Sequence, residues 1–199
     1  MSSVNTPALE TQRLRLRRFD SNDINALLAI FGDRKTNTYL PMFPLETLAQ
    51  ARVFFEQIYE KAHQSPVGYR YAVCLKSDNI PIGYVHVGME DSHDLGYGLR
   101  CEYWHRGIMT EAAGAVLRQL QEDGFPYVTA THDINNPYSG AVMKKLGMRY
   151  RYSYEEQWQP KNIKVIFRMY QLNLDGREDW VYRKYWEQAK VRFVESGIA

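Results

Sequence analysis

Cysteine and histidine are scarce in this chain, and those present do not form groups. Of 199 residues only two are cysteines, Cys74 and Cys101, which are too few for a disulfide framework and lack the spacing of a metal-ligating pair. The five histidines are scattered along the sequence, at positions 63, 86, 93, 105 and 132. A zinc site needs several such ligands at a characteristic spacing. We therefore expect no metal ion in this protein.

Long apolar runs and an excess of charge of one sign are also missing. No run of about 18 apolar residues occurs, and the first residues lack the apolar core of a signal peptide. Lysine and arginine number 25 against 23 aspartates and glutamates, so the formal net charge is only +2. A dedicated nucleic-acid-binding protein carries a much larger positive charge. We expect a soluble, cytoplasmic protein with no membrane and no nucleic-acid partner.

One stretch, residues 99–122, combines a glycine-containing loop with a long amphipathic helix. Ile108, Ala112 and Val116 recur at intervals that place them on one face of an α-helix. Gly107 precedes this helix and leaves room for a bound group to approach the backbone. The unpaired amide groups and the dipole of a helix N-terminus favour an anion such as phosphate. The alternative is that Gly107 only turns the chain into a buried helix.

A second stretch, residues 132–148, carries start and stop signals for a short helix. Asn136 is a preferred N-cap, Pro137 suits the first helical position, and Gly147 suits the residue after the end. An apolar run over residues 127–130 precedes the stretch and predicts a strand. The local order is therefore strand, loop, short helix and strand.

These two stretches resemble signatures of a known enzyme superfamily. Residues 104–112, Trp-His-Arg-Gly-Ile-Met-Thr-Glu-Ala, resemble the acyl-CoA pyrophosphate loop of the GNAT acetyltransferases. Residues 136–139 (Asn-Pro-Tyr-Ser) and 145–148 (Lys-Leu-Gly-Met) resemble a later signature of the same superfamily. Residues 10–17 are similar to the first strand of its ribosomal-protein N-terminal acetyltransferase branch, the RimJ/RimL-like proteins. Met109 departs from the pattern, because the family usually has glycine or alanine there.

The resemblance implies the α/β (α+β) GNAT fold, in which helices flank a mixed central sheet of about seven strands. An antiparallel meander is followed in that fold by two parallel strands that splay apart. The sequence agrees, since residues 69–75, 82–87 and 94–99 read as three strands with tight connections. Gly96 and Gly98 inside the third strand suggest a bulge or the close approach of a ligand.

We divide the chain into a flexible tail over residues 1–8, an acetyltransferase domain over residues 9–174 and a C-terminal helical extension over residues 175–199. Apolar side chains at helical spacing predict one helix over residues 177–195. The superfamily core does not need this helix. It packs on its own domain or docks onto a second subunit, so we expect a monomer or a homodimer.

Two segments in the first half of the chain bear on the acceptor of the reaction. Residues 36–44 form an apolar loop rich in proline and aromatic residues, which is either a hydrophobic plug or a wall of the acceptor site. In the resembled family this region lines the acceptor groove. Residues 46–63 then predict a helix that buries Leu48, Val53, Phe54 or Phe55, and Ile58 at helical spacing.

The resemblance implies acetyl-CoA as the cosubstrate. Its pantetheine arm is expected to pair with backbone at the end of the strand over residues 94–99, and its pyrophosphate with the loop before the long helix. A backbone amide within residues 99–101 is the expected donor to the oxyanion. The residues expected to bind acetyl-CoA are Leu99, Cys101, His105, Arg106, Gly107, Ile108, Met109, Thr110, Asn136 and Ser139.

The implied reaction is attack of a neutral primary amine on the acetyl thioester through a tetrahedral intermediate. It needs a base for the amine, a donor for the oxyanion and a proton for the leaving thiolate. Asp94 is the base that we choose over His93 and Glu102, although an aspartate there could equally form a turn. Ser139, with Tyr138 beside it, is the expected proton donor, although Ser139 could instead satisfy the helix start.

The sequence leaves the acceptor amine open. A protein N-terminal amine has a pKa of about 7.7–8.0, so deprotonating it at pH 7 costs about 1 kcal/mol, whereas a lysine amine costs roughly 4.6 kcal/mol. We expect an N-acetyltransferase that acts on a primary amine, with a protein or peptide N-terminus as one candidate. A small amine such as an antibiotic or polyamine is the alternative substrate. A non-catalytic acyl-CoA-binding module is the alternative function.

Overall fold

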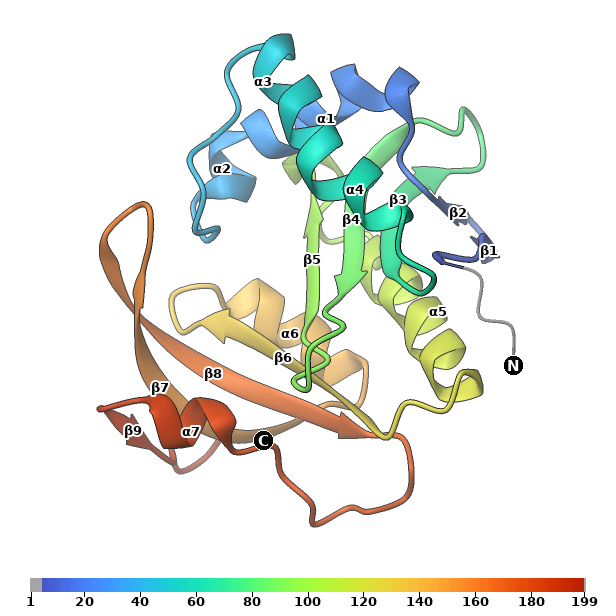
Figure 1. Cartoon of the computed structure of the whole chain (residues 1–199). Helices are drawn as coiled ribbons and strands as arrows, with labels where there is room; N and C mark the ends of the chain where they lie inside the picture. Colours follow the sequence, from blue (N-terminus) through green and yellow to red (C-terminus); the bar gives the residue numbers. More distant parts are fainter. Residues whose placement is uncertain (1–4, 199) are drawn as a thin grey trace.

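The computed structural model describes residues 5–198 and contains two antiparallel sheets surrounded by helices (Figure 1). The strands of the first sheet, in spatial order, are β1 (Leu9–Glu10), β2 (Leu14–Arg17), β3 (Tyr69–Leu75), β4 (Pro81–Val87) and β5 (Leu95–Leu99). The second sheet has the order β6 (Tyr127–Asp133), β8 (Ile163–Asn173), β7 (Arg149–Trp158) and β9 (Arg192–Phe193). No helix of the described chain is both long and apolar enough to cross a membrane.

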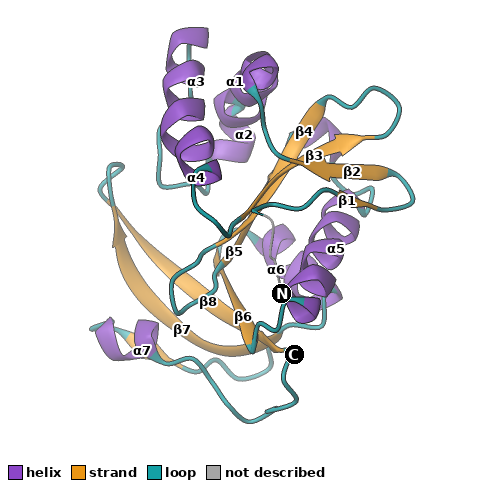
Figure 2. Ribbon diagram, turned by 45° about the vertical axis from the view of Figure 1, so that its right-hand side comes forward, coloured by secondary structure: helices purple, strands orange, loops and turns teal. Residues whose placement is uncertain are grey.

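The helices occupy three regions of the molecule. Figure 2 shows the N-terminal helices on one side of the first sheet, α5 on its other side and α6 close to the second sheet. The N-terminal group is η1 (Ser21–Asp23), α1 (Ile24–Gly32), α2 (Arg34–Asn37), α3 (Leu48–Phe54), η2 (Phe55–Glu60) and α4 (Lys61–His63). The others are η3 (Cys101–Tyr103), α5 (Ile108–Glu122), α6 (Pro137–Lys145) and α7 (Lys184–Gln188).

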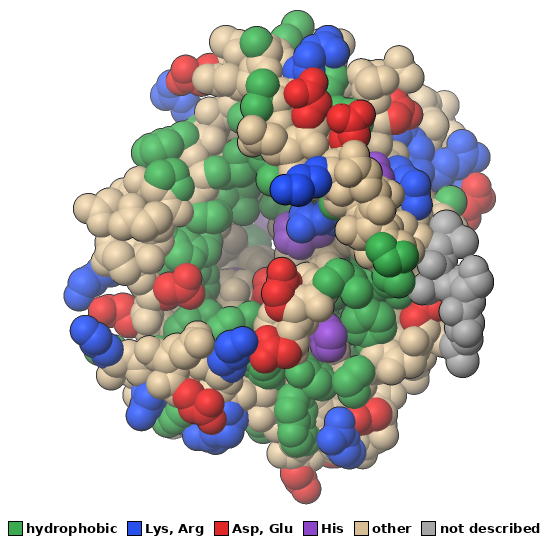
Figure 3. Space-filling model, viewed as in Figure 1, with side chains coloured by type: hydrophobic (Ala, Val, Ile, Leu, Met, Phe, Trp, Pro, Cys, Tyr) green, Lys and Arg blue, Asp and Glu red, His purple; other side chains and the backbone are tan. Residues whose placement is uncertain are grey.

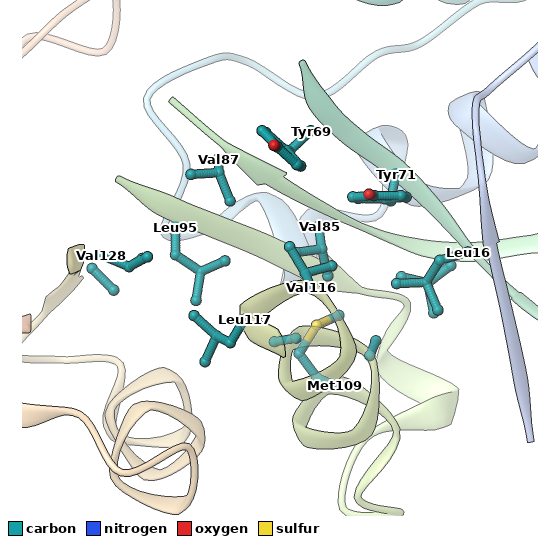
Figure 4. Close-up of a cluster of buried hydrophobic side chains, with 14 of the residues drawn as sticks. Leu16, Tyr69, Tyr71, Val85, Val87, Leu95, Met109, Val116, Leu117 and Val128 are labelled. Carbon is teal, nitrogen blue, oxygen red and sulfur yellow. The ribbon is translucent and has the colours of Figure 1, made fainter. Parts of the chain in front are cut away.

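Both faces of the first sheet are covered, which is why its strands read as nearly continuous apolar runs. One face packs on α5 through side chains that include Tyr71, Val85 and Leu95 (Figure 4). The opposite face packs on the N-terminal helices through Ala72 and Tyr84. Alternate residues of a strand point to opposite faces, so each strand contributes to both cores. The first sheet therefore forms the middle layer of the molecule.

The predicted splay of two parallel strands is present in an extreme form. Within residues 5–198, β5 and β6 share one isolated parallel bridge, between Asp94 and Thr129. Beyond it β6 pairs along its whole length with β8, from Tyr127 opposite Asn173 to Asp133 opposite Phe167. The single mixed sheet that we expected is therefore two antiparallel sheets that meet at one point.

The helix predicted over residues 46–63 is present as α3, η2 and α4 in direct succession, but part of its buried face was predicted wrongly. Leu48 and Val53 are about half exposed, at 49% and 48%. Phe55 is buried as predicted, and the other buried residues are Ala51 and Tyr59. The larger aromatic rings take the core position, because an aromatic side chain buries more apolar area than an aliphatic one. The ring of Tyr59, for example, lies 4.4 Å from that of Phe19.

The long C-terminal helix predicted over residues 177–195 was also wrong. This segment contains only the five-residue α7 and the two-residue β9, which adds to the edge of β7. Its aromatic side chains cover the second sheet, where the ring of Tyr185 stacks on Tyr154 at 5.3 Å. The apolar spacing that suggested a helix therefore serves an irregular segment that packs on its own domain.

The flexible tail predicted over residues 1–8 needs a similar correction from residue 5 onward. Residues 1–4 lie outside the described residues. Asn5 and Thr6 are buried, and the amide nitrogen Nδ2 of Asn5 donates to the carbonyl oxygens of Ala62 at 3.0 Å and Ser65 at 2.8 Å. The backbone N–H of Thr6 donates to the carbonyl of Gly68 at 2.6 Å. Buried polar groups of this kind are retained because each finds a partner.

We expect Trp186→Ala to lower the free energy of unfolding by about 2 kcal/mol. Truncating a fully buried tryptophan costs more than this, and the Trp186 indole is only half-buried. The Trp186 ring lies 5.5 Å from that of Tyr152, and the guanidinium groups of Arg183 and Arg192 lie over it. Chemical denaturation measures the difference. Lys190→Ala, at an exposed position of the same segment, is the control and should change stability by less than about 0.5 kcal/mol. Equal stabilities of the two variants would contradict a stabilising role for this segment.

Candidate active site

A cavity of about 850 Å³ opens where β5 and β6 part. Figure 3 shows it as the hollow near the centre of the molecule, with hydrophobic side chains along its walls. The N-terminus of α5 and one side of α6 line one end. Side chains from the N-terminal helices, β3, β4 and the β7–β8 hairpin line the other. The cavity therefore has two compartments, one at the N-terminus of α5 and α6 and the other between the N-terminal helices and the β7–β8 hairpin. They join near the point where the two sheets meet.

The edge of β5 presents free backbone groups to this cavity. The N–H of Arg100 donates to the carbonyl of Ile82 on β4 at 3.0 Å. Because backbone groups alternate in direction along an antiparallel strand, those of Tyr97 and Leu99 point the other way, into the gap. The carbonyl of Leu99 accepts from the indole N–H of Trp104 at 2.6 Å. The N–H groups of Tyr97 and Leu99 are therefore the strand donors available to a bound molecule.

Gly96 and Gly98 of β5 do not mark a bulge, because the register with β4 is regular there, and both residues line the cavity. Their cross-strand partners are His86 and Tyr84, whose rings stack on each other at 5.5 Å. A Cβ atom on Gly98 would lie 2.5 Å from Cε1 of Tyr84, and one on Gly96 would collide with the His86 ring. The two glycines therefore make room for these rings.

The start of α5 is an open anion-binding geometry. Gly107 occupies the N-cap position with φ at 71°, in the left-handed region, and no side chain caps the helix. The N–H of Glu111 is the first to enter the helical pattern, donating to the carbonyl of Gly107 at 3.0 Å. The amide groups of residues 108–110 consequently have no helical acceptor. Together with the helix dipole they favour a bound phosphate.

Glu111 fastens this loop to the first strands. Its carboxylate accepts from the hydroxyl of Thr11 at 2.5 Å and from Nε of Arg13 at 2.6 Å. Nη1 of Arg13 also donates to the carbonyl of Arg106 at 2.9 Å. Burial alone would raise the pKa of Glu111, but the hydrogen bonds from Thr11 and Arg13 hold it below its ordinary value. The loop before α5, which we call the anion loop, is thus fastened by Thr11 and Arg13, two residues that the sequence did not indicate.

Ser139 and Tyr97 connect α6 to β5 across the gap. Oγ of Ser139 donates to the phenol oxygen of Tyr97 at 3.1 Å, and the Tyr97 hydroxyl donates to the Ser139 carbonyl at 2.8 Å. The side chain of Asn136 caps α6 by accepting from the N–H of Ser139 at 3.3 Å. Burial raises the pKa of Tyr97, so its hydroxyl stays protonated at neutral pH. No motif in the sequence pointed to Tyr97.

Tyr138 lies apart from the Ser139 hydroxyl, at the rim of the cavity. Its side chain is 60% exposed, and its ring lies 5.0 Å from the ring of His105 and 6.4 Å from that of Trp104. These rings together form an aromatic surface beside the anion loop. The position suits contact with a bound molecule at the cavity entrance.

Asp94 lies at the junction between the two compartments. One carboxyl oxygen, Oδ1, is enclosed and accepts no hydrogen bond from residues 5–198. Burial raises the pKa of Asp94 to about 7, with a further contribution from the charge of Glu156 and a hydrogen bond from Thr129 acting in the opposite direction. A carboxyl group with a pKa near neutrality is suited to accept a proton at physiological pH.

The other two candidate bases lie elsewhere. The ring of His93 packs against Phe125 at 4.9 Å and does not line the cavity. Glu102 is exposed and pairs with Arg100 beyond the end of β5. Of the three carboxyl and imidazole groups considered from the sequence, the described structure brings only Asp94 to the cavity.

The apolar loop over residues 36–44 forms a wall of the cavity. Tyr39, Leu40 and Met42 line it, whereas Phe43 is 60% exposed. Across the opening, Trp158 and Phe167 of the β7–β8 hairpin line the facing wall with rings 4.8 Å apart. The hairpin and the N-terminal helices therefore enclose this compartment from two sides.

The structure brings nearly all predicted site residues to one place. Those that line the cavity are Asp94, Leu99, His105, Arg106, Gly107, Ile108, Met109, Thr110, Asn136, Tyr138 and Ser139. Cys101 is the exception, because it lies in the turn η3 beyond the strand and outside the lining. The side chains of Ile108 and Met109 are buried in the core, so only their amide groups are available to a ligand. Within residues 5–198 no three His, Cys, Asp or Glu side chains converge as metal ligands would.

Comparisons with known proteins agree with this geometry. A family model described as the acetyltransferase (GNAT) domain matches residues 13–149. An uncharacterized N-acetyltransferase of Bacillus subtilis, YnaD, is 27% identical over 146 residues, which cover 71% of this chain and 82% of the relative. The crystal structure of a GNAT-family acetyltransferase from Bacillus anthracis superposes with a TM-score of 0.73 at 23% identity, covering 85% of this chain and 99% of the other.

A second solved structure is RimL, a ribosomal L7/L12 α-N-protein acetyltransferase in complex with coenzyme A. It superposes with a TM-score of 0.72 at 16% identity and covers 85% of this chain and 99% of its own. These likenesses confirm the expected fold, and acetyltransferases of this fold use acetyl-CoA. The chain belongs to the GNAT acetyltransferase family, and it is an N-acetyltransferase.

Proposed function

We propose that this protein transfers the acetyl group of acetyl-CoA to a primary amine by direct attack, through a tetrahedral intermediate, inside the cavity between the two sheets. One observation carries the proposal. A single cavity joins the open N-terminus of α5, the free edge of β5, the Ser139–Tyr97 pair and the buried carboxyl of Asp94. Each of these features supplies one of the requirements of acyl transfer.

The residues of the cavity fit acetyl-CoA. The amide groups of residues 108–110 are suited to bind its pyrophosphate, and the cationic side chains of Arg106 and Lys145 line the same compartment. The free backbone groups of Tyr97 and Leu99 are suited to pair with the amide groups of the pantetheine arm. The acetyl group would then lie near the junction at Asp94.

Asp94 is the proposed base. Its carboxylate would take the proton of the acceptor ammonium group, directly or through one water molecule. Its pKa of about 7 leaves a substantial fraction ionised at neutral pH while keeping the group basic enough to accept a proton. The N–H of Leu99 is the proposed donor to the oxyanion, because it is the last strand amide that points into the gap.

Ser139 is the proposed proton donor to the leaving thiolate, with Tyr97 as its partner. The two hydroxyls lie 3.1 Å apart, with Ser139 as the donor. Ser139 would turn its proton toward the sulfur, and the phenol would then turn its own proton from the Ser139 carbonyl toward Oγ to replace it. Tyr138 remains a predicted participant, and its place beside His105 favours contact with acetyl-CoA over proton transfer.

The acceptor is either a protein or peptide N-terminal amine or a small amine. The likeness to RimL, which is named for a protein α-amine, supports the first. An assay of thiol release from acetyl-CoA with a panel of peptides and small amines tests the proposal. Transfer to any primary amine supports it. Tight binding of coenzyme A without transfer to any amine would favour a non-catalytic acyl-CoA-binding module instead.

We expect Gly107→Glu to abolish detectable coenzyme A binding in calorimetry, because a carboxylate at the helix N-cap would repel the pyrophosphate. Gly124→Glu is the matched control. Gly124 lies just beyond the other end of the same helix, and its φ of 83° imposes the same backbone strain as the 71° of Gly107. The control should bind coenzyme A normally. Unchanged affinity in Gly107→Glu would contradict the assignment of the loop.

We expect Ser139→Ala to reduce kcat by about a hundredfold, the usual contribution of a positioned proton donor, while the Kd for coenzyme A stays unchanged. Steady-state kinetics and calorimetry measure the two quantities. Tyr97→Phe should show a smaller decrease in kcat, because the serine hydroxyl remains. A wild-type kcat in Ser139→Ala would remove this residue from the mechanism.

We expect Asp94→Asn to stabilise the folded protein increasingly as the pH rises from about 4 to 7. The folded-state pKa of about 7 lies above the ordinary 3.8, so the folded protein holds a proton that the unfolded chain releases, and stability is lost as the pH rises. A shift of roughly three units at about 1.36 kcal/mol each limits the gain to about 4 kcal/mol. Denaturation at pH 4 and pH 8 measures it.

The control for this experiment is Glu122→Gln, which removes an exposed carboxyl at the end of α5. It should leave the difference in stability between pH 4 and pH 8 as in the wild type. The proposed role also predicts that Asp94→Asn loses turnover at neutral pH. An Asp94→Asn variant with the pH profiles of the wild type in both stability and turnover would refute the assignment of a raised pKa and of the base.

A further inference from the structure

The acceptor compartment is the end of the cavity lined by the N-terminal helices, β3, β4 and the β7–β8 hairpin. Apart from Asp94, the charged side chains that line it are cationic. Arg70 of β3 and Lys35 of α2 line it, and neither takes part in an ion pair within residues 5–198. Asp94 is the one carboxyl group at this end of the described cavity, since Asp133 lies beside α6 and accepts from the backbone N–H of Asn135 at 2.8 Å. The lining therefore carries two cations that are not paired with a carboxylate in the described structure, and Asp94 is its one acidic group.

The sheet register places the two ends of this compartment. Arg70 lies opposite His86 on β4, and His86 lies opposite Gly96 on β5. Asp94 is two residues before Gly96, so it shares the same face of the sheet. Arg70 on β3 is two strands away from β5, and two strand spacings correspond to roughly 10 Å. Burial lowers the pKa of His86 to about 4, so the ring between them is neutral and compensates neither charge.

The walls between these ends are apolar and aromatic. Met42 and Phe54 line the compartment on the side of the N-terminal helices, and Trp158 and Phe167 line it from the hairpin. Within the described lining, these walls carry no carboxylate that could pair with a second or third cation on a ligand. A polyamine or an aminoglycoside carries several ammonium groups, each of which would need a carboxylate or would be repelled.

We infer that the acceptor is an amine whose apolar or aromatic body carries a carboxylate at its other end, with the amine directed to Asp94 and the carboxylate to Arg70. This inference rests on the proposed function, because it assigns the acceptor of that same reaction. The same chemistry is found in a free aromatic amino-carboxylate and in a peptide N-terminus followed closely by a carboxylate.

The test uses two acceptors that differ only in the charge remote from the amine, 4-(aminomethyl)benzoate and 4-(aminomethyl)benzamide. The wild type should favour the benzoate by tenfold or more in kcat/KM, which is typical of one hydrogen bond to a charged group. In Arg70→Gln the preference should fall to near unity through a higher KM for the benzoate, with little change for the benzamide. This double-mutant cycle isolates the interaction of Arg70 with the carboxylate.

Arg52→Gln is the matched control, since Arg52 is an exposed arginine of α3 that does not line the cavity. It should keep the wild-type preference for the benzoate. Thermal unfolding of both variants checks that each is folded. A variant Arg70→Lys should restore part of the preference, because it returns the charge without the paired donors of arginine.

Several results would overturn the inference. An equal benzoate-to-benzamide ratio in the wild type and Arg70→Gln would remove Arg70 from acceptor recognition. Faster acetylation of spermidine or kanamycin than of the benzoate would show a polycationic acceptor and leave the proposed function standing. Transfer to no amine at all, with coenzyme A bound, would instead overturn the proposed function. In contrast, faster acetylation of a phenylalanine-glutamate peptide than of the benzoate would support the inference and identify a peptide as the source of this chemistry.

Discussion

The structure depends on one backbone constraint, which is that β5 and β6 come together only at Asp94 and Thr129. A parallel pair that continued beyond this bridge would use the amide and carbonyl groups of both strands in a ladder. Because the pairing stops, the edge of β5 keeps its groups for a bound molecule, and they face a cavity where water or a ligand can satisfy them. The bridge therefore creates the binding edge and fixes where it ends.

Three long-range contacts keep the gap beyond this bridge at a set width. Tyr97 joins β5 to α6 across 42 residues of sequence, Glu111 joins the start of α5 to the first strands across 98, and Lys161 joins the β7–β8 hairpin to α2 across 124. The contacts lie at the middle, at the anion loop and at the acceptor compartment. The cavity is thus a product of tertiary contacts at every point along its length, although its individual parts are local structures.

This division explains which features the sequence could predict. The N-cap of Asn136 and the turn at Gly107 into the long helix depend on neighbouring residues, and both are present as expected. The partners of Tyr97 and Glu111 lie far away in the chain, and no periodicity or motif indicates them. The C-terminal segment failed for a related reason, because the spacing around Trp186 reflects the shape of the sheet beneath it and fits a helix only by coincidence.

The position of Asp94 has a consequence for how the fold and the chemistry constrain each other. Its backbone forms the bridge that joins the sheets, whereas its side chain lines the cavity with one oxygen enclosed. Because the backbone of Asp94 is fixed in the bridge, its side chain stays buried in the folded protein. Ionising this carboxyl group therefore remains costly. A positively charged amine lowers that cost when it binds, because an opposite charge favours the carboxylate. The acceptor ammonium would therefore help to ionise the proposed base, whereas the same ion pair would stabilise the protonated amine and oppose its deprotonation.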